Sequence, residues 1–284
     1  MNNYAERKRN IRLGGLVAVT AVLLIAFTGC DRAESLSAVP LEVSAGIAGG
    51  YTRAAGDKDA TNYEKKNNFE AGDQITIRKS TAAESSAVAY KKGTNGWLPV
   101  DNSQQILTSG NEAFFTSYPP EYTSILSDQS TYTNFWKSNR LTSTATATSN
   151  HVSFTFSPAA AKITVIVIYA VNNTAVGAKV EGQNVCTESG KTGVLQLLCT
   201  SNEVRRHTYT GILSTAASSY TISVSTTVGG TSETKSYVEK GGGLTLQAGY
   251  EYQYTFTATT ELILSSVIVK EFQSTTEENV GPAT

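Results

Sequence analysis

Cys30 is the residue whose surroundings predict the clearest chemistry in this sequence. It follows an apolar run, residues 16–27, and Gly29 stands directly before it. The run is too short to span a hydrocarbon core, which needs about 20 residues, but it has the length of a secretion-signal core. A small residue followed by cysteine is typical of lipoprotein signal peptides, in which the thiol receives diacylglycerol after cleavage. The chain ahead of the run is basic, with Arg7, Lys8, Arg9 and Arg12.

We therefore expect residues 1–29 to be a signal peptide and Cys30 to carry the lipid, with residues 30–40 as a tether. Several acyl chains on one residue hold a protein to a membrane in an effectively permanent way. The alternative is an ordinary secretory signal that happens to contain a cysteine. No A-x-A-like cleavage site lies nearby, and the chain turns polar at Asp31, which favours the lipoprotein interpretation.

Two cysteines remain in the mature chain, Cys186 and Cys199. In an oxidising compartment they could pair as a disulfide, because each lies in a strand-like stretch beside the turn at residues 188–191. Two separately buried thiols are the other interpretation, and the residues favour neither.

Catalytic and cofactor chemistry finds little support. Residues 190–192 read Gly-Lys-Thr, like the end of a phosphate-binding loop, but that motif needs glycine where Val185 stands and a helix after it. The two histidines, His151 and His207, have no second ligand at metal spacing. No G-x-S-x-G elbow is present. We expect no metal, no cofactor and no enzyme activity: such a chain binds or assembles.

Aromatic side chains offer a further binding hypothesis. Trp97 and Trp136, together with many tyrosines, could form a platform on which sugar rings stack. Packing in a core or on a strand face is the more frequent use of such residues. An exposed tryptophan in a shallow cleft would favour the sugar-binding alternative.

Composition predicts a β-rich protein. A formal net charge of −1 argues against nucleic acid as a partner. One methionine and an abundance of threonine, serine, valine and tyrosine are typical of strands rather than helices.

Strand-like patterns follow along most of the mature chain. Residues 41–47 alternate between apolar and polar types, so Leu41, Val43, Ala45 and Ile47 should share one face. Residues 53–68 are too polar to bury and predict an exposed loop. Residues 121–150 lack a period, and we expect their aromatic residues to plug a loop or short helix into a core. Further strands are predicted at residues 74–77, 87–91, 96–100 and 113–118.

The second half gives stronger signals. Residues 151–156 alternate as a half-buried strand, whereas residues 162–169 are apolar on both faces and predict a central strand covered on both sides. The spacing of the strands fits an all-β fold of two β-sandwiches, which we place at residues 41–150 and 151–272, with a flexible tail at 273–284. The later predicted strands are residues 194–198, 220–224, 252–256 and 262–269.

The order of these features resembles the fimbrillins and fimbrillin-like lipoproteins, the type V pilus subunits of Gram-negative gut and oral anaerobes. The resemblance comprises the cysteine motif, the first strand followed by Thr-Arg-Ala at residues 52–54, and the turn Phe-Glu-Ala-Gly-Asp at residues 69–73. It continues with the aromatic strand ending in Tyr-Pro-Pro at 118–120 and with residues 246–252. The family usually has tryptophan at position 69, where this chain has Phe69.

The resemblance implies two transthyretin-like sandwiches on the outer membrane surface, held there by lipid on Cys30, with other pilus subunits as partners. It also implies that a protease cuts between Arg53 and Ala54, which releases the first strand. A strand from the next subunit then fills the groove by β-augmentation, and residues 262–272 are the expected donor. An uncut Arg53 in an anchoring subunit is the alternative. A surface glycan-binding lipoprotein and a secreted hydrolase are rival functions.

Overall fold

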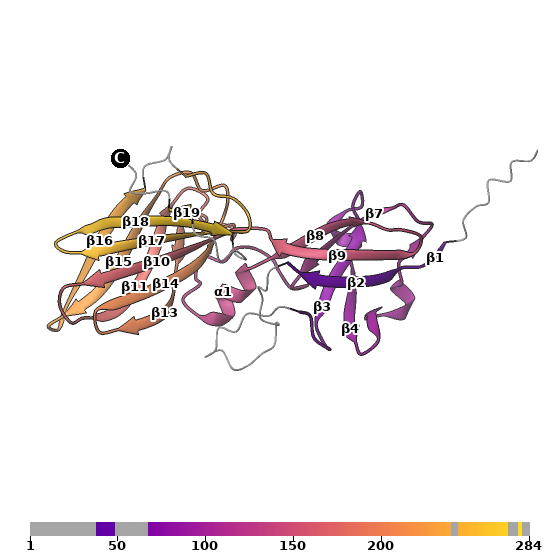
Figure 1. Ribbon diagram of the computed structural model, residues 1–284, viewed down its shortest axis with the longest axis horizontal. Helices are drawn as coiled ribbons and strands as arrows, with labels where there is room; N and C mark the ends of the chain where they lie inside the picture. Colours follow the sequence, from indigo (N-terminus) through magenta and orange to yellow (C-terminus); the bar gives the residue numbers. More distant parts are fainter. Residues whose placement is uncertain (1–37, 49–67, 240–243, 272–277, 280–284) are drawn as a thin grey trace, which may run out of the picture. The chain divides into compact units, whose positions relative to one another are not determined.

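The computed structural model describes residues 38–48, 68–239, 244–271 and 278–279 (Figure 1). Strands dominate the described residues, so the predicted all-β fold is confirmed. The predicted signal peptide lies outside these residues, as do Cys30, Arg53, Ala54 and nearly all of the tail at 273–284. No helix in the described part is long and apolar enough to cross a membrane.

The first β-domain is built on a seven-stranded sheet with the order β2-β9-β8-β7-β3-β4-β5. The sheet curls until β2 contacts β5. β1 and β6 form a separate two-stranded sheet. The strands are β1 (Val39–Pro40), β2 (Glu42–Ile47), β3 (Gln74–Lys79), β4 (Val88–Gly93), β5 (Gly96–Pro99), β6 (Leu107–Thr108), β7 (Ala113–Tyr118), β8 (Leu141–Thr146) and β9 (His151–Pro158).

Alternation by two creates the core of this domain, as the sequence predicted. Along β9 every second residue is buried, and along β3 Ile75 and Ile77 are buried while Thr76 and Arg78 face outward. Two 3-10 turns, Glu84–Ser86 and Asn102–Gln104, lie in the loops. The strands predicted at residues 87–91 and 96–100 form as β4 and β5, which pair as a hairpin.

The change from one sheet system to the other comes after Pro158, not at residue 150. β9, which we placed in the second sandwich, pairs in parallel with β2 and continues the first sheet through β8. Ala159 N–H donates to Arg140 C=O, and β10 then begins at Ala161. This change lies within about ten residues of the boundary that we expected near residue 150. The parallel pairing that joins β9 to the first sheet leaves no local pattern in the sequence, because its partner is far along the chain.

The second domain is a sandwich of two sheets. A six-stranded sheet has the order β13-β14-β10-β17-β18-β19, and a four-stranded sheet the order β12-β11-β15-β16. The strands are β10 (Ala161–Tyr169), β11 (Thr174–Gly182), β12 (Val194–Gln196), β13 (Leu198–Glu203), β14 (Arg206–Leu213), β15 (Tyr220–Val228), β16 (Thr231–Glu239), β17 (Tyr250–Ala258), β18 (Leu262–Glu271) and β19 (Glu278–Asn279).

The core of the sandwich lies between these sheets and is separate from the core of the first domain. β10 is central, with β14 antiparallel on one side and β17 parallel on the other. Residues 163–167 of β10 are buried on both faces, which confirms the prediction of a doubly covered strand.

Between β7 and β8 the chain leaves the first sheet and packs on the second domain. This segment, residues 121–139, is called the arm below. It contains α1 (Tyr132–Ser138), the one α-helix among the described residues, which Thr131 caps by accepting from Asn134 N–H. Ile125 and Phe135 of the arm belong to the sandwich core, whereas Leu141, directly after the arm, belongs to the first core. The predicted helix therefore exists, and it fills the core of the other domain.

Candidate functional site

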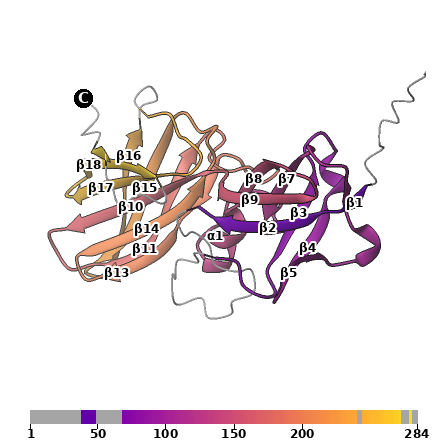
Figure 2. The same cartoon turned by 45° about the vertical axis from the view of Figure 1, so that its right-hand side comes forward.

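The first strand, β2, is the candidate functional element because it lies at the rim of the seven-stranded sheet. Among the described strands it pairs with β9 alone, in a parallel ladder from Glu42 opposite His151 to Ile47 opposite Phe156. Both views show β2 alongside β9 (Figures 1 and 2). Parallel ladders are slightly less stable per residue than antiparallel ones. β2 is thus held by one ladder of the weaker kind.

The apolar face of β2 covers the first core, as predicted. Leu41 and Val43 are buried, and Ala45 and Ile47 are partly buried against the same cluster. Ser44 and Gly46 are also only partly covered, so burial weakens toward the end of the strand. The strand therefore makes its firmest contacts at its beginning.

The start of the strand has additional hydrogen bonds. Leu41 N–H donates to Ile106 C=O at 2.9 Å, and Asn150 Nδ2 donates to Pro40 C=O at 3.3 Å. β1 also pairs with β6 through Val39 and Thr108. At the other end, Ala48 N–H donates to Phe156 C=O at 2.9 Å.

The apolar residues that share a cluster with β2 are largely aromatic, and Phe154, Phe156 and Phe69 are together called the seat below. Phe154 and Phe156 of β9 are almost fully buried, and Phe69 contacts Phe156, Trp97 and Tyr118 edge to face at centroid distances of 5.2, 5.2 and 5.4 Å. Edge-to-face pairs of this kind add to the stabilisation from area burial. The seat is an apolar surface that adjoins the edge of β9 to which β2 is hydrogen-bonded.

The tryptophans do not form a sugar platform. Trp97 is 4% exposed and belongs to the first core, and Trp136 on α1 packs against the sandwich core. Neither is presented in a shallow cleft, so the observation that would have favoured the aromatic sugar site is absent for both.

Cys186 and Cys199 are free thiols. Cys186 is buried in the loop after β11 and its Sγ lies 2.9 Å from Lys191 C=O, whereas Cys199 is on β13 with Sγ near Ser201 C=O. Burial raises the pKa of both thiols. The structure corresponds to the second alternative, two separate thiols, and contains no bond between them.

The two histidines lie in different domains. His151 is exposed on β9, and His207 is fully buried on β14, where its ring lies 4.9 Å from that of Tyr169. Burial lowers the pKa of His207. Among the described residues no cluster of three or more histidine, cysteine, aspartate or glutamate side chains could hold a metal ion.

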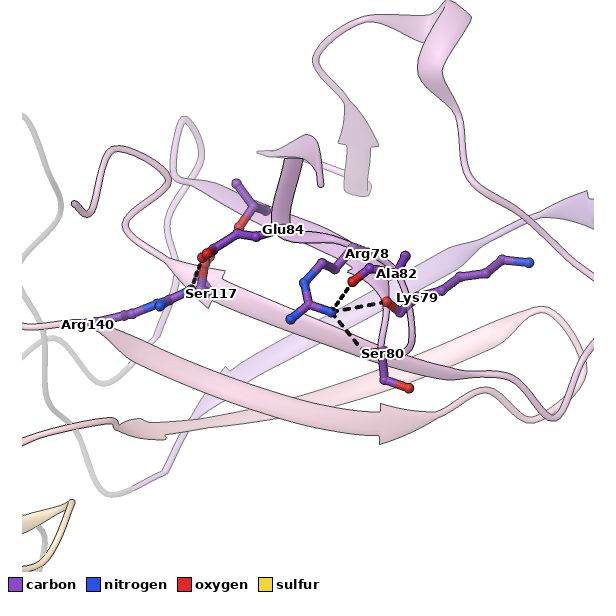
Figure 3. Close-up of polar contacts among 8 residues, drawn as sticks. Arg78, Lys79, Ser80, Ala82, Glu84, Ser117 and Arg140 are labelled. Carbon is purple, nitrogen blue, oxygen red and sulfur yellow. Dashed lines mark hydrogen bonds and ion pairs between the residues drawn. The ribbon is translucent and has the colours of Figure 1, made fainter. Parts of the chain in front are cut away.

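A cluster of arginines on the outer face of the first sheet was missed by sequence reasoning (Figure 3). Arg78 Nη1 donates to the carbonyls of Lys79, Ser80 and Ala82 at 3.3, 3.0 and 2.8 Å, and its guanidinium lies 4.5 Å from the centre of the Phe115 ring. These contacts fold the loop after β3 over the sheet.

The folded loop presents Glu84 to a second arginine, Arg140, at 2.8 Å. Arg140 also lies over the Tyr122 ring at 5.1 Å. Both arginines lie over aromatic rings, but single arginines in a strand and a loop carry no sequence signal for such an arrangement. The hydrogen bonds of Arg78 and the ion pair of Arg140 are made within the chain. The two arginines therefore hold the loop after β3 in position.

The comparisons with known proteins identify the fold. No family model and no curated protein matches the chain. Among solved structures, a "putative cell adhesion protein" from Bacteroides ovatus superimposes with a TM-score of 0.55 at 16% identity, covering 83% of this chain and 98% of the other. The chain has that protein's fold.

Other solved structures match with lower scores. A second protein described in the same words, from Bacteroides uniformis, gives a TM-score of 0.48 at 16% identity and covers 83% of this chain and 98% of its own. The fimbrial anchor protein Mfa2 from Porphyromonas gingivalis gives 0.41 at 10% identity, with coverage of 82% and 98%.

Proposed function

We propose that this chain is a non-catalytic subunit of a pilus on the bacterial surface, exported as a lipoprotein and held to the outer membrane through Cys30. Its partners are other subunits of the filament. The observation that carries the proposal is the position of β2, a rim strand whose expected lipid attachment site lies before it and whose expected cleavage site, Arg53, lies after it. The shared fold with a protein named for cell adhesion supports it.

The strand's position gives cleavage a physical consequence. A cut between Arg53 and Ala54 leaves β2 attached to the rest of the protein by noncovalent contacts alone. Its departure would free the edge of β9 and uncover the seat, which includes Phe154 and Phe156. An edge with unpaired backbone groups over an apolar seat captures an extended strand by β-augmentation, and the strand of a neighbouring subunit would fill it.

The structure bears on which segment donates that strand. Residues 262–272 were the expected donor, but β18 pairs with β17 from Leu262 to Glu271 and with β19 on its other side. Leu262 and Val267 are buried in the sandwich core. Donation of β18 would break its full ladder with β17 and remove Leu262 and Val267 from the core. We therefore propose strand capture at β9 without assigning the donor to β18.

The test is the N-terminal sequence of the protein recovered from sheared surface filaments. A start at Ala54 is the expected result for a cleaved and polymerised subunit. In parallel, Arg53→Ala should leave the protein labelled by palmitate but unable to enter SDS-resistant ladders. Lys58→Ala, which removes a cation from the same polar stretch, is the matched control and should assemble normally. Ladders that persist in Arg53→Ala would contradict release of the first strand.

Lipid attachment has its own test. Cys30→Ser should abolish palmitate labelling and accumulate the uncleaved precursor, whereas Cys199→Ser should be labelled like the parent protein. Normal labelling of Cys30→Ser would overturn the anchor and leave the fold-based part of the proposal standing.

A further inference from the structure

A hollow of about 440 Å³ opens on the second domain where the loop before β12 meets the arm. The loop contributes the Gly-Lys-Thr motif that the sequence singled out, and the arm contributes two polar residues. The lining consists of Ser127, Asp128, Gly190, Lys191, Thr192, Gly193, Val194 and Gln196. Its volume is in the range of small-molecule sites in proteins.

The walls of the hollow are held in place by hydrogen bonds within the chain. The carboxylate of Glu188 accepts from Ser127 N–H at 2.8 Å, from Ser127 Oγ at 2.7 Å and from Lys191 Nζ at 2.8 Å. These donors lower the pKa of Glu188 to about 2, so it is ionised at neutral pH.

Backbone bonds join the same two segments. Thr187 N–H donates to Ile125 C=O at 3.0 Å, and Gln196 N–H donates to Ser127 C=O at 2.7 Å. The arm and the loop therefore form one rigid wall rather than two that move independently. A preformed site of this kind orders few groups when a ligand binds.

The lining presents opposite charges and neutral hydrogen-bonding groups. Asp128 offers a carboxylate, whose Oδ1 accepts from Ser130 N–H at 3.0 Å, and Lys191 offers an ammonium group. Thr192 and Gln196 add a hydroxyl and an amide. Because the Lys191 ammonium group is already paired with the Glu188 carboxylate, the hollow carries no excess positive charge.

This chemistry discriminates between ligand classes. A phosphorylated ligand would meet the Asp128 carboxylate, and the motif at residues 190–192 lies in a loop between β11 and β12 without the helix that phosphate loops require. An apolar ligand would cover the Asp128 carboxylate and the ion pair of Lys191 with Glu188, and removing charged groups from water costs free energy. A ligand dense in hydroxyls can donate to the carboxylate and accept from the ammonium at once.

We propose that this hollow binds a neutral saccharide, with Asp128 accepting hydrogen bonds from sugar hydroxyls and Lys191 donating to them. The site goes beyond the structural role of a filament subunit and does not depend on it. It would give a subunit on the cell surface an adhesive specificity that uses polar side chains instead of stacked tryptophans.

The experiment measures binding of maltotriose, N-acetyllactosamine and mannotriose to the full chain by saturation-transfer NMR and calorimetry, with inorganic phosphate as a fourth probe. One of the three saccharides should bind. Asp128→Asn and Lys191→Met should each weaken that binding about tenfold or more, as the loss of a hydrogen bond to a charged group predicts. Asp128→Asn keeps an oxygen for Ser130, which protects the local fold.

Lys179→Met is the matched control. Lys179 also makes a 2.8 Å ion pair with a glutamate, Glu181, but on β11 outside the hollow, so this variant should bind as the parent does. The proposal is overturned if none of the three saccharides binds, if binding is unchanged in both hollow variants, or if phosphate displaces the saccharide. Filament entry of the same variants stays normal under either outcome, which separates this test from that of the assembly role.

Discussion

The strands β2 and β18 lie toward opposite ends of the described chain, and they are held in different ways. β2 has one parallel ladder, with β9, and its burial fades toward Ile47. β18 is paired along its length with β17 and in part with β19, and it contributes Leu262 and Val267 to the sandwich core. Departure of β2 costs one parallel ladder, whereas departure of β18 would break a longer antiparallel ladder and remove two residues from the sandwich core. Apolar, β-prone sequence at a chain end does not distinguish the two cases.

The same substitution on each strand gives the largest expected contrast. Val267→Asp places a charge in the sandwich core, where Val267 is 2% exposed, and should cost more than about 4 kcal/mol of unfolding free energy. Val43→Asp should cost only about 2 kcal/mol, because local undocking of β2 limits the penalty. Urea unfolding of the chain starting at Asp31 measures both. Equal losses would show that β2 is as integral to its sheet as β18 is to the other.

The buried carboxyl of Glu239 makes the stability of the second domain, which contains β18, depend on pH. Glu239 ends β16, which contacts β18, and is 4% exposed with Tyr237 Oη at 3.5 Å from Oε2. Burial raises its pKa above the usual 4.5, so the folded state keeps a proton that the unfolded state has lost. Unfolding free energy therefore falls as pH rises from 4.5 through the raised pKa.

Glu239→Gln should remove that fall and stabilise the protein by about 1–2 kcal/mol at pH 8, with no gain at pH 4. Glu233→Gln, which removes a more exposed carboxyl from the same strand, is the control and should leave the pH dependence in place. A Glu239→Gln protein that still loses stability as pH rises would mean that another group causes the loss.

The two histidines, one in each domain, allow the acid sensitivity of the two domains to be distinguished. Burial lowers the pKa of His207 below 6.5, so the unfolded state binds a proton that the folded state refuses, and stability is lost as pH falls from 6.5 through the lowered pKa. In His207→Gln the urea midpoint should depend less on pH between pH 6.5 and 5, because about 1 kcal/mol of pH-dependent unfolding free energy is removed. His151→Gln on the exposed face of β9 should not change this dependence, and a weaker dependence in that variant instead would place the acid sensitivity in the first domain.

The smallest expected effect strengthens β2. No atom lies within 4 Å of a Cβ added at Gly46, so Gly46→Ala should stabilise the first domain by about 0.5 kcal/mol through reduced freedom of the unfolded chain. Gly211→Ala on β14 is the opposite case, because its Cβ would lie 2.5 Å from Leu197 Cδ2, and it should destabilise. Thermal unfolding measures both. If Gly46→Ala also slows filament growth, strand release is part of assembly.

Local patterns predicted the strands that alternate or are wholly apolar. The burial of β9 and the position of β10 follow directly from residue types, as does the inward face of β2. β16 was missed because its outward residues are serine, threonine and valine and its inward ones include Lys235. An inward-pointing charge protects an edge strand from pairing with other chains, but in a sequence it resembles a loop.

The candidate site was predictable only in part. The apolar face of Leu41 and Val43 is visible in the sequence, but its partner β9 is a distant parallel strand, and no turn or spacing announces such a pair. The hollow beside Lys191 depends on Asp128, which arrives on the arm from between two strands of the other domain. Contacts of that separation depend on tertiary packing, which periodicity does not encode.

The arm also constrains the order of folding in a chain that is synthesised from its N-terminus. Ile125 and Phe135 emerge before β8 and β9 complete the first sheet, yet the core they fill is supplied by strands that come after residue 160. A nascent chain that has reached Pro158 therefore carries a finished first domain and an apolar arm with nothing to cover it. Until the strands of the sandwich follow, the apolar side chains of the arm stay uncovered, and we expect a protein truncated at Pro158 to aggregate through them.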